Sequence, residues 1–333
     1  MPYFFFISRY EEYLPFTPDR HGRFPAALSL AGKYSFLQQP VVDLWLLHFR
    51  EMLPFPVHPP YQAGWDATMD VDMIWKYLNK KPALQRWGII KDILKLNFKG
   101  LRERQQVLKH HRPDPFDCFN EISSCIGKDI RYFILTSPEL TRFDRNTAPV
   151  HPGFQKKIRV LTNGTNIGIH PSYYAVARKS IGNEINALQE ALGGTIYQSR
   201  QHFIRLSLPE TYHQLLEAGI REDFTMGYPE VNGFRAGTSL PFYWYDLSKE
   251  EPTQLFIHPF VYMDATQLFY GRQNPQEQLA EIERIACQVR SSHGRFIGIW
   301  HNYILGDQLT YPEQLVLLKK SVALLNQIFS PED

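Results

Sequence analysis

The chain has 333 residues, 44% of them hydrophobic, which suffices for one large domain with an appendage or for two ordinary domains. Its 36 Lys and Arg residues and 34 Asp and Glu residues leave a net charge of +2, which argues against a nucleic-acid-binding protein, since that class needs clustered positive charge. The cysteines are Cys118, Cys125 and Cys287, with no CxxC pair, so neither a disulfide framework nor a thiolate metal site is expected.

The first sixty residues are rich in proline and aromatic residues. The apolar run Phe4–Ile7 is too short for a signal peptide or a membrane span, so we predict a cytoplasmic protein without a membrane-spanning segment. Residues 41–53 have the pattern of an amphipathic helix, whereas the proline cluster at 54–60 predicts a linker. We therefore expect an N-terminal region with a linker at 1–60 and a second domain at 61–330.

After this linker, short apolar runs alternate with helix-like stretches. Strands are predicted at 67–71, 131–135, 167–170, 196–204, 233–236, 255–263 and 296–300. Helices are predicted between them, for example at 155–161, 180–192, 210–218 and 276–290. Such alternation is typical of an α/β fold with a parallel sheet, either open or closed as a barrel. Polar residues that follow the strands should then meet at one edge of the sheet.

Two carboxylates, Asp70 and Asp72, come at the end of the first predicted strand. Side chains at i and i+2 point to the same side of a strand, and their repulsion is tolerable beside a cation. The alternative is a solvated strand end or a cap for a following helix at 73–78. His170 ends another strand and is followed by Pro171, which suits a metal-ligating imidazole, although a structural histidine is the commoner role for such a residue.

Other polar residues lie on or after later strands. His202 lies near Arg200, whose guanidinium could hold a carboxylate beside a metal or pair with a helix. Arg235 has small neighbours, and Asp264 and His301 each end an apolar run. Together these residues are the inventory of metal-assisted hydrolysis. The sequence contains no GxGxxG, GxxxxGK[ST], GxSxG or HExxH motif that would favour other chemistries.

The order of these motifs over residues 61–305 resembles the polysaccharide deacetylases with NodB homology, in particular an atypical bacterial branch with an N-terminal accessory region. Residues 7–13, 21–25 and 40–43 are similar to the end of that region, whose earlier part would be missing from this chain. The resemblance implies a distorted (β/α) barrel of about seven parallel strands. It also implies a metal-dependent enzyme that removes acetyl groups from a cell-surface glycan or its precursor.

The resemblance assigns roles to individual residues. Asp70 would be the general base and Asp72 a metal ligand, although one residue is inserted between them. His170 matches the first of the two histidines of the family's next motif, but Tyr174 stands at the position of the second. We assign His202 as the replacement, because two carboxylates and one imidazole bind a cation poorly without a further ligand.

The remaining motifs complete the predicted site. Arg235 would orient Asp70, and Asp264 would tune His301, the general acid, whose motif begins with Ile299 in place of the usual Leu. The expected ion is Zn²⁺, with Co²⁺, Ni²⁺ or Mn²⁺ as alternatives.

Three aromatic residues are predicted to bind the acetylated saccharide. Tyr173 would contribute its backbone N–H to an oxyanion, and Tyr228 and Trp244 would belong to an aromatic sugar platform, unless they pack in the core. Two other functions are open at this stage. One is a glycan-binding relative without catalysis, and the other is an amidohydrolase, although such enzymes usually begin with an HxH pair.

Overall fold

A nine-stranded sheet forms the centre of the protein in the computed structural model, which describes residues 2–54, 62–127, 129–161 and 166–330. The strands are β1 (Gly64–Val71), β2 (Arg131–Leu135), β3 (Asn166–His170), β4 (Gln198–Ser199), β5 (Glu222–Asp223), β6 (Phe242–Asp246), β7 (Glu251–Ile257), β8 (Tyr262–Met263) and β9 (Arg295–His301). Their order is β6-β7-β5-β4-β3-β2-β1-β9-β8, and every neighbouring pair is parallel except β6 and β7. The predicted α/β class with a mainly parallel sheet is confirmed.

The sheet is strongly curved. Only residues 258–261 connect β7 to β8, although seven inter-strand intervals separate these strands in the sheet order. A connection of this length spans at most about 17 Å, whereas seven intervals in a flat sheet would cover roughly 34 Å. The two ends of the sheet must therefore approach each other. The pairing among the described residues is nonetheless a linear order of nine strands, so the barrel of about seven strands stays a prediction.

Alternating side chains build a core on each face of the sheet. Tyr132 and Ile134 of β2 pack in the larger cluster, whereas Phe133 packs in the smaller cluster with Ile297 and Ile299 of β9. This alternation is the two-residue period of a strand that is buried on both faces. On β9, positions 297, 299 and 301 share one face, so the smaller core leads directly to His301.

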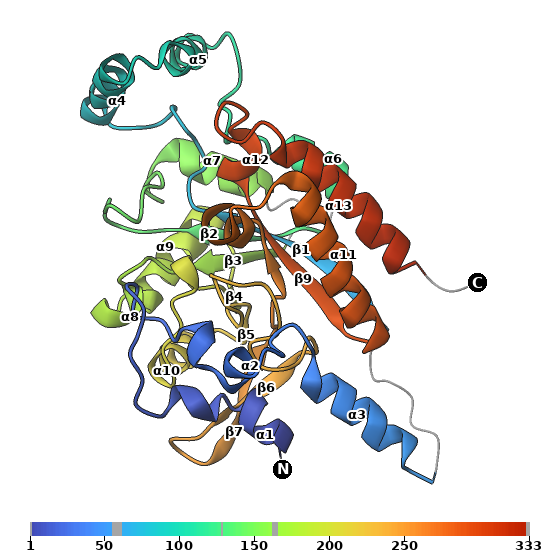
Figure 1. Cartoon of the computed structure of the whole chain (residues 1–333). Coiled ribbons are helices and arrows are strands. Elements are labelled where there is room, and N and C mark those ends of the chain that lie inside the picture. Colours follow the sequence, from blue (N-terminus) through green and yellow to red (C-terminus); the bar gives the residue numbers. More distant parts are fainter. Residues whose placement is uncertain (1, 55–61, 128, 162–165, 331–333) are drawn as a thin grey trace.

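Helices surround the sheet, and most of them pack against it (Figure 1). They are α4 (Pro82–Leu94), α5 (Phe98–Leu108), α6 (Phe119–Ile126), α7 (Pro152–Leu161), α8 (Ala175–Arg178), α9 (Ile181–Leu192), α10 (Glu210–Glu217), α11 (Pro275–Ser291), α12 (Asn302–Gly306) and α13 (Gln314–Ile328), with a 3₁₀ turn η3 (His202–Ile204) and a π-helical turn η4 (Thr266–Gly271). In Figure 1, α4 and α5 project beyond the body that the sheet and the other helices form.

The N-terminal region is more helical than the sequence predicted. It contains α1 (Pro2–Ile7), η1 (Tyr10–Glu12), η2 (Ala26–Leu28), α2 (Leu30–Lys33) and α3 (Val41–Glu51). The predicted helix at 41–53 is present and ends at Glu51, while residues 55–61 of the predicted linker lie outside the described residues. The backbone N–H of Val42 donates to Gly237, and that of Phe234 donates to Leu37, so this region lies directly against the loop after β5. The division of the chain at residue 60 stays a prediction.

Three predicted strands differ from the observed ones. Residues 233–236 form a loop, in which Gly233 has a φ of +143°. The run 255–263 contains the end of β7 and all of β8, which pair at opposite ends of the sheet. The run 196–204 contains only β4, because the chain turns into η3 directly afterwards. Apolar runs mark burial, and burial alone does not separate a strand from a packed loop.

Candidate metal centre

Polar side chains at the carboxyl ends of β1, β3 and β9 meet at one edge of the sheet. Asp70 is the second-to-last residue of β1, and Asp72 directly follows the strand. His170 and His301 are the last residues of β3 and β9. In the parallel pair β1–β9, Asp70 is the register partner of His301. Parallel strands place their carboxyl ends at a common edge, which is where α/β folds assemble their sites.

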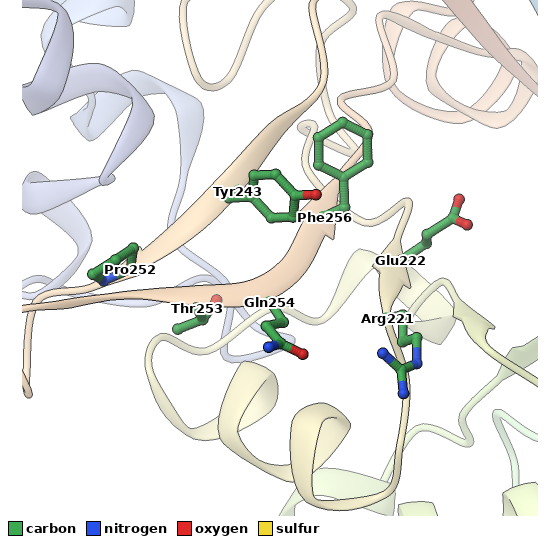
Figure 2. A pocket seen from close by; sticks show the side chains of 7 residues that line it. All are labelled: Arg221, Glu222, Tyr243, Pro252, Thr253, Gln254 and Phe256. Carbon is green, nitrogen blue, oxygen red and sulfur yellow. The ribbon is translucent and has the colours of Figure 1, made fainter.

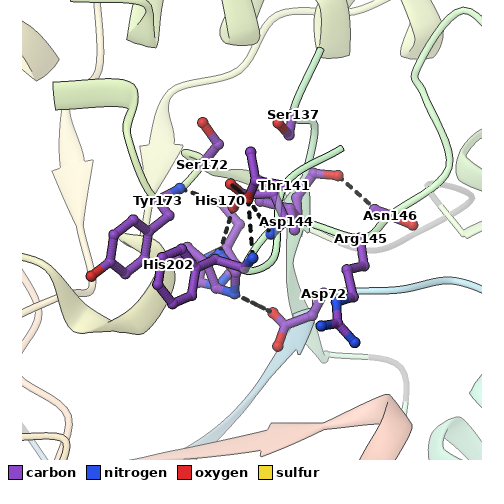
Figure 3. Close-up of polar contacts among 12 residues, drawn as sticks. Asp72, Ser137, Thr141, Asp144, Arg145, Asn146, His170, Ser172, Tyr173 and His202 are labelled. Carbon is purple, nitrogen blue, oxygen red and sulfur yellow. Dashed lines mark hydrogen bonds and ion pairs between the residues drawn. The ribbon is translucent and has the colours of Figure 1, made fainter. Parts of the chain in front are cut away.

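Asp72, His170 and His202 form a compact group of metal-ligating atoms, all within 4.8 Å of one another. Nε2 of His170 lies 3.4 Å from Oδ1 of Asp72, and Nε2 of His202 lies 3.7 Å from the same oxygen. Figure 3 shows these two imidazoles side by side, facing Asp72. Two imidazole nitrogens and a carboxylate oxygen are a common ligand set for Zn²⁺ and related divalent ions.

The Nδ1 atoms of both imidazoles lie within hydrogen-bonding distance of oxygen atoms. Nδ1 of His170 lies 2.6 Å from the carbonyl oxygen of Arg200, so Nδ1 must carry the proton. Nδ1 of His202 lies 3.0 Å from Oδ1 of Asp144. Both contacts direct the unprotonated Nε2 of a neutral imidazole toward Asp72, which is how ligand histidines are usually oriented.

This arrangement fits a cation. Oδ1 of Asp72 is buried and has no hydrogen-bond partner within the described part of the chain. With both imidazoles neutral, three acceptor atoms face one another, which a bound cation would stabilise. The charges of these groups also shift one another's pKa values. Burial lowers the pKa of His202, but the carboxylates of Asp72 and Asp144 outweigh this effect and raise it to about 9. Against the effect of burial, His202 and His170 hold the pKa of Asp72 well below its usual range.

Asp70 is held by Arg200 rather than by the predicted Arg235. Nη1 of Arg200 donates to Oδ1 of Asp70 at 2.8 Å, and both side chains are buried. Arg235 instead pairs with Glu12 of the N-terminal region, with an Nη2–Oε2 distance of 2.5 Å, and donates to the carbonyl of Gly227. The loop that carries Arg235 packs against η1 instead of ending a strand at the site, so the sequence-based assignment of Arg235 is corrected.

His301 and Asp264 form a buried pair next to Asp70. Nδ1 of His301 lies 2.6 Å from Oδ1 of Asp264, and the backbone N–H of His301 donates to the other carboxylate oxygen at 2.9 Å. Nε2 of His301 lies 4.0 Å from Oδ2 of Asp70. Burial lowers the pKa of the imidazole, but Asp264 outweighs this effect with the help of Asp72 and Asp70, and the pKa rises to about 9.

A cavity of about 170 Å³ opens over these groups. Asp70, Asp72, His170, His202 and His301 line it together with apolar and aromatic side chains, namely Phe203, Ile204, Pro229, Met263, Ala265, Phe269, Tyr270 and Tyr303. Arg23 of the N-terminal region also lines the cavity and donates to the hydroxyl of Tyr270 at 3.1 Å. The cavity therefore joins a polar floor to a largely apolar wall.

The aromatic residues predicted to bind substrate lie elsewhere. Tyr228 and Trp244 are each only 1% exposed, and Tyr228 accepts a hydrogen bond from Arg9 in the core. The backbone N–H of Tyr173 donates to Asp144, and its hydroxyl contacts His21, so neither group faces the cavity floor. All three assignments are corrected. Tyr228 and Trp244 pack in the core, and aromatic content alone does not distinguish a binding platform from packing. The backbone N–H of Tyr173 is already bonded to Asp144.

Two residues of the site, Asp144 and Arg23, were not predicted as site residues from the sequence. Asp144 accepts hydrogen bonds from the hydroxyl of Thr141 at 2.8 Å and from the backbone of Tyr173 at 2.9 Å, besides its contact with His202 (Figure 3). It lies in an irregular loop between β2 and α7, where neither periodicity nor a strand end marks it. Arg23 comes from the N-terminal region, outside the span where site residues were expected.

Asp144→Asn is expected to lower the affinity for a divalent ion about 10- to 100-fold, because the amide holds the His202 imidazole less well than the carboxylate. Isothermal titration of the metal-free protein with Zn²⁺ measures this change. Asp246→Asn is the matched control, since Asp246 is a buried carboxylate that pairs with His213 at 2.5 Å, away from the site. Equal affinity in the Asp144 variant and the wild type would contradict the orienting role.

A second cavity, of about 560 Å³, lies at the antiparallel edge of the sheet (Figure 2). It is lined by Glu222 of β5, by the preceding Arg221 and by residues of β6 and β7, including Tyr243 and Phe256. Its carboxylate, Glu222, pairs with His258 at 3.0 Å. The described lining residues include one acid and no histidine, so this cavity does not contain a cation-binding group like that of the first cavity.

No helix in the described part of the chain is long and apolar enough to cross a membrane. The cytoplasmic location stays a prediction from the sequence.

Comparison with known proteins gives a family match for a short part of the chain and a fold match for most of it. Residues 2–55 match a family of unknown function (DUF7033). A search of curated proteins found no match. A crystal structure from Mycobacterium smegmatis, provisionally described as a polysaccharide deacetylase, has a TM-score of 0.52 and 16% identity, and the match covers 84% of this chain and 88% of that chain.

A 4-alpha-glucanotransferase from Thermococcus litoralis has a TM-score of 0.44 and 13% identity over 82% of this chain and 38% of that chain, which is too weak to support a relationship. The match to the Mycobacterium smegmatis structure shows that this chain and a protein described as a polysaccharide deacetylase share a fold.

Proposed function

We propose that this protein is a metal-dependent hydrolase that removes acetyl groups from a saccharide, a cell-surface glycan or its precursor. The observation that carries the proposal is the group formed by Asp72, His170 and His202, which adjoins two further pairs, Asp70 with Arg200 and His301 with Asp264. The first group is suited to bind a cation, and each of the two pairs contains a proton-transfer group. The fold shared with the Mycobacterium smegmatis protein supports the choice of deacetylation over other hydrolyses. We also infer that the curved sheet is the distorted barrel of that class.

In this proposal Asp72, His170 and His202 hold a divalent ion, with Zn²⁺ favoured and Co²⁺, Ni²⁺ or Mn²⁺ as alternatives. The chemistry that such an ion supplies is polarisation of the acetyl carbonyl and a lower pKa for water. The Oδ2 atom of Asp70 accepts a proton from the attacking water. Arg200 donates a hydrogen bond to Oδ1, the other carboxylate oxygen. His301 gives a proton from its Nε2 to the departing amine or alcohol, and Asp264 holds the opposite ring nitrogen.

The cavity wall suits an acetyl group on a sugar. Ile204, Met263 and Ala265 offer apolar surface for the methyl group. Phe269 and Tyr270 are the most exposed aromatic residues of the lining and lie on η4, where they can stack on a sugar ring.

The test is acetate release from a small panel of N- and O-acetylated saccharides. The protein is first treated with a chelator and then supplied with Zn²⁺, Co²⁺, Ni²⁺ or Mn²⁺ in turn. We expect release that depends on an added ion. Stoichiometric metal binding without acetate release from any saccharide would contradict the proposal and would favour a glycan-binding relative without catalysis.

Turnover is expected to fall as the pH rises through about 9, because His301 must be protonated to act as the acid and its pKa is about 9. In Asp264→Asn the main group that raises this pKa is removed, so the alkaline limb of the kcat profile should move to lower pH. Profiles of kcat against pH for both proteins measure the shift. An alkaline limb at the same pH in both would contradict the pairing as the cause.

A further inference from the structure

The helices α4 and α5 and the turn between them, residues 80–109, form a helical arm that projects from the body of the protein (Figure 1). None of the residues of α4, all of which the structure describes, is buried. The exposed large apolar residues of the arm are Leu84, Trp87, Ile90, Ile93, Leu94, Leu96, Phe98 and Leu108. Exposure is greatest at the tip, with 74% for Leu94, 72% for Leu96 and 68% for Phe98. A contiguous exposed apolar surface of this kind marks an interaction site.

The arm is also strongly basic. It contains nine Lys and Arg residues and two acidic residues, a net charge of +7 in a chain whose total is +2. Both acids are neutralised, since Asp92 pairs with Arg104 at 2.8 Å and Glu103 pairs with Lys76 at 3.0 Å. Lys91, Lys95 and Lys99 remain exposed around the apolar tip. Apolar residues flanked by exposed lysines are the pattern of a helix that lies in a membrane interface.

The backbone conformation at the tip also supports an interaction site. Leu96 follows the last turn of α4 with a φ of +51°, a conformation for which glycine or asparagine is the usual residue. Its side chain is mostly exposed, so burial within the chain does little to compensate for this strain. A contact outside the chain would account for a large apolar residue in such a position.

We propose that the helical arm docks on an anionic lipid bilayer, with Leu94, Leu96 and Phe98 inserted among the acyl chains and the lysines at the headgroups. Charge decides between this occupant and a second copy of the protein. Two arms that each carry +7 would repel each other, whereas anionic headgroups attract them.

Docking would also bring the candidate site to the lipid surface. A basic groove of about 980 Å³ is lined by side chains from residues 76–104, which include part of the arm, and from the loop at 137–151. One wall begins at Lys76, four residues after Asp72, and the other includes Thr141 and Arg145. These two residues lie on either side of Asp144 in the chain, and Asp144 holds His202. Arg145 lines this groove and is drawn beside Asp72 in Figure 3. The acetylated saccharide would then be one carried on a lipid, a consequence that rests on the proposed function.

Co-sedimentation of the full chain with lipid vesicles tests the docking. We expect binding to vesicles of phosphatidylglycerol and phosphatidylcholine, and little binding to vesicles of phosphatidylcholine alone. Each lysine near an anionic surface contributes about a fivefold change in affinity, so Lys95→Gln/Lys99→Gln should weaken binding roughly 25-fold. Leu94→Ser/Phe98→Ser should weaken it more than about 100-fold through lost apolar burial. All four positions are exposed, so folding should be unaffected.

Two matched double variants serve as controls. Phe49→Ser/Met52→Ser removes similarly exposed apolar residues near the end of α3, and Lys319→Gln/Lys320→Gln removes an exposed lysine pair on α13. Both should bind like the wild type. The docking proposal is overturned if the wild type does not sediment with the anionic vesicles. It is also overturned if the arm variants bind as tightly as the controls. Dimerisation in sedimentation velocity that Leu94→Ser/Phe98→Ser abolishes would instead identify a second copy as the occupant.

Acetate release separates this inference from the proposed function. The probes are an N-acetylglucosamine glycolipid in the anionic vesicles and a soluble N-acetylglucosamine oligosaccharide. Leu94→Ser/Phe98→Ser should lower kcat/KM on the glycolipid and leave the soluble reaction unchanged. Equal rates of wild type and variant on the glycolipid would contradict the lipid-borne substrate. Release from neither probe would count against the proposed function, while vesicle binding would still decide the docking.

Discussion

Asp70→Asn is expected to reduce turnover by about 10²- to 10⁴-fold, the usual contribution of a general base. The amide has the shape of the carboxylate, and its oxygen can still accept the hydrogen bond that Arg200 donates at 2.8 Å. The fold and the cation site should therefore survive, while the proton acceptor at Oδ2 is lost. Single-turnover acetate release together with metal analysis of the same sample measures both properties.

Asp66→Asn is the matched control for this experiment. Asp66 lies on the same strand, four residues before Asp70, and pairs with Arg295 at 2.5 Å away from the cavity. We expect wild-type turnover from this variant. Full turnover in Asp70→Asn would remove Asp70 as the base, whereas loss of the ion from that variant would assign it to the cation site instead.

The second large effect is expected from His170→Ala and His202→Ala, which should each abolish stoichiometric metal binding and activity. Each substitution removes one of three ligands and leaves the carboxylate of Asp72 with fewer partners. The wild type should also gain stability on addition of Zn²⁺, by about 2.7 kcal/mol when the free ion is at 100 times its Kd. The variants should lose most of this gain.

Metal analysis after dialysis and thermal unfolding with and without Zn²⁺ measure these two properties. His213→Ala is the control, because His213 pairs with the buried Asp246 outside the cavity. That variant should keep both the bound ion and the gain in stability with Zn²⁺. Retention of the full metal content in both His170→Ala and His202→Ala would refute the ligand set.

The sequence by itself determined the fold class and most of the polar groups that converge at the site. Strands β2 and β9 are mainly apolar and buried on both faces, and the carboxyl-terminal residues of β1 and β3 are buried as well, so the ends of these strands are readily located in the sequence. Because these strands are parallel, the polar residues at their ends lie at a common edge. Asp70, Asp72, His170 and His301 could be expected together for that reason alone.

Only the tertiary structure decided which other side chains reach that edge. Arg200 and Arg235 both lie within predicted strands, but the loop of Arg235 packs on Glu12, and Arg200 is the one that binds Asp70. Asp144 reaches His202 from an irregular loop. The choice depends on contacts between segments far apart in the chain, which a local pattern of residues does not encode.

The same reason explains the aromatic residues. Tyr228 and Trp244 are buried because the N-terminal region and helix α10 cover them, whereas Phe269 and Tyr270 remain exposed on η4 at the cavity. The sequence supplied aromatic residues of the right kind in both places. Their exposure was decided by what packs over them, and packing is a property of the whole folded chain.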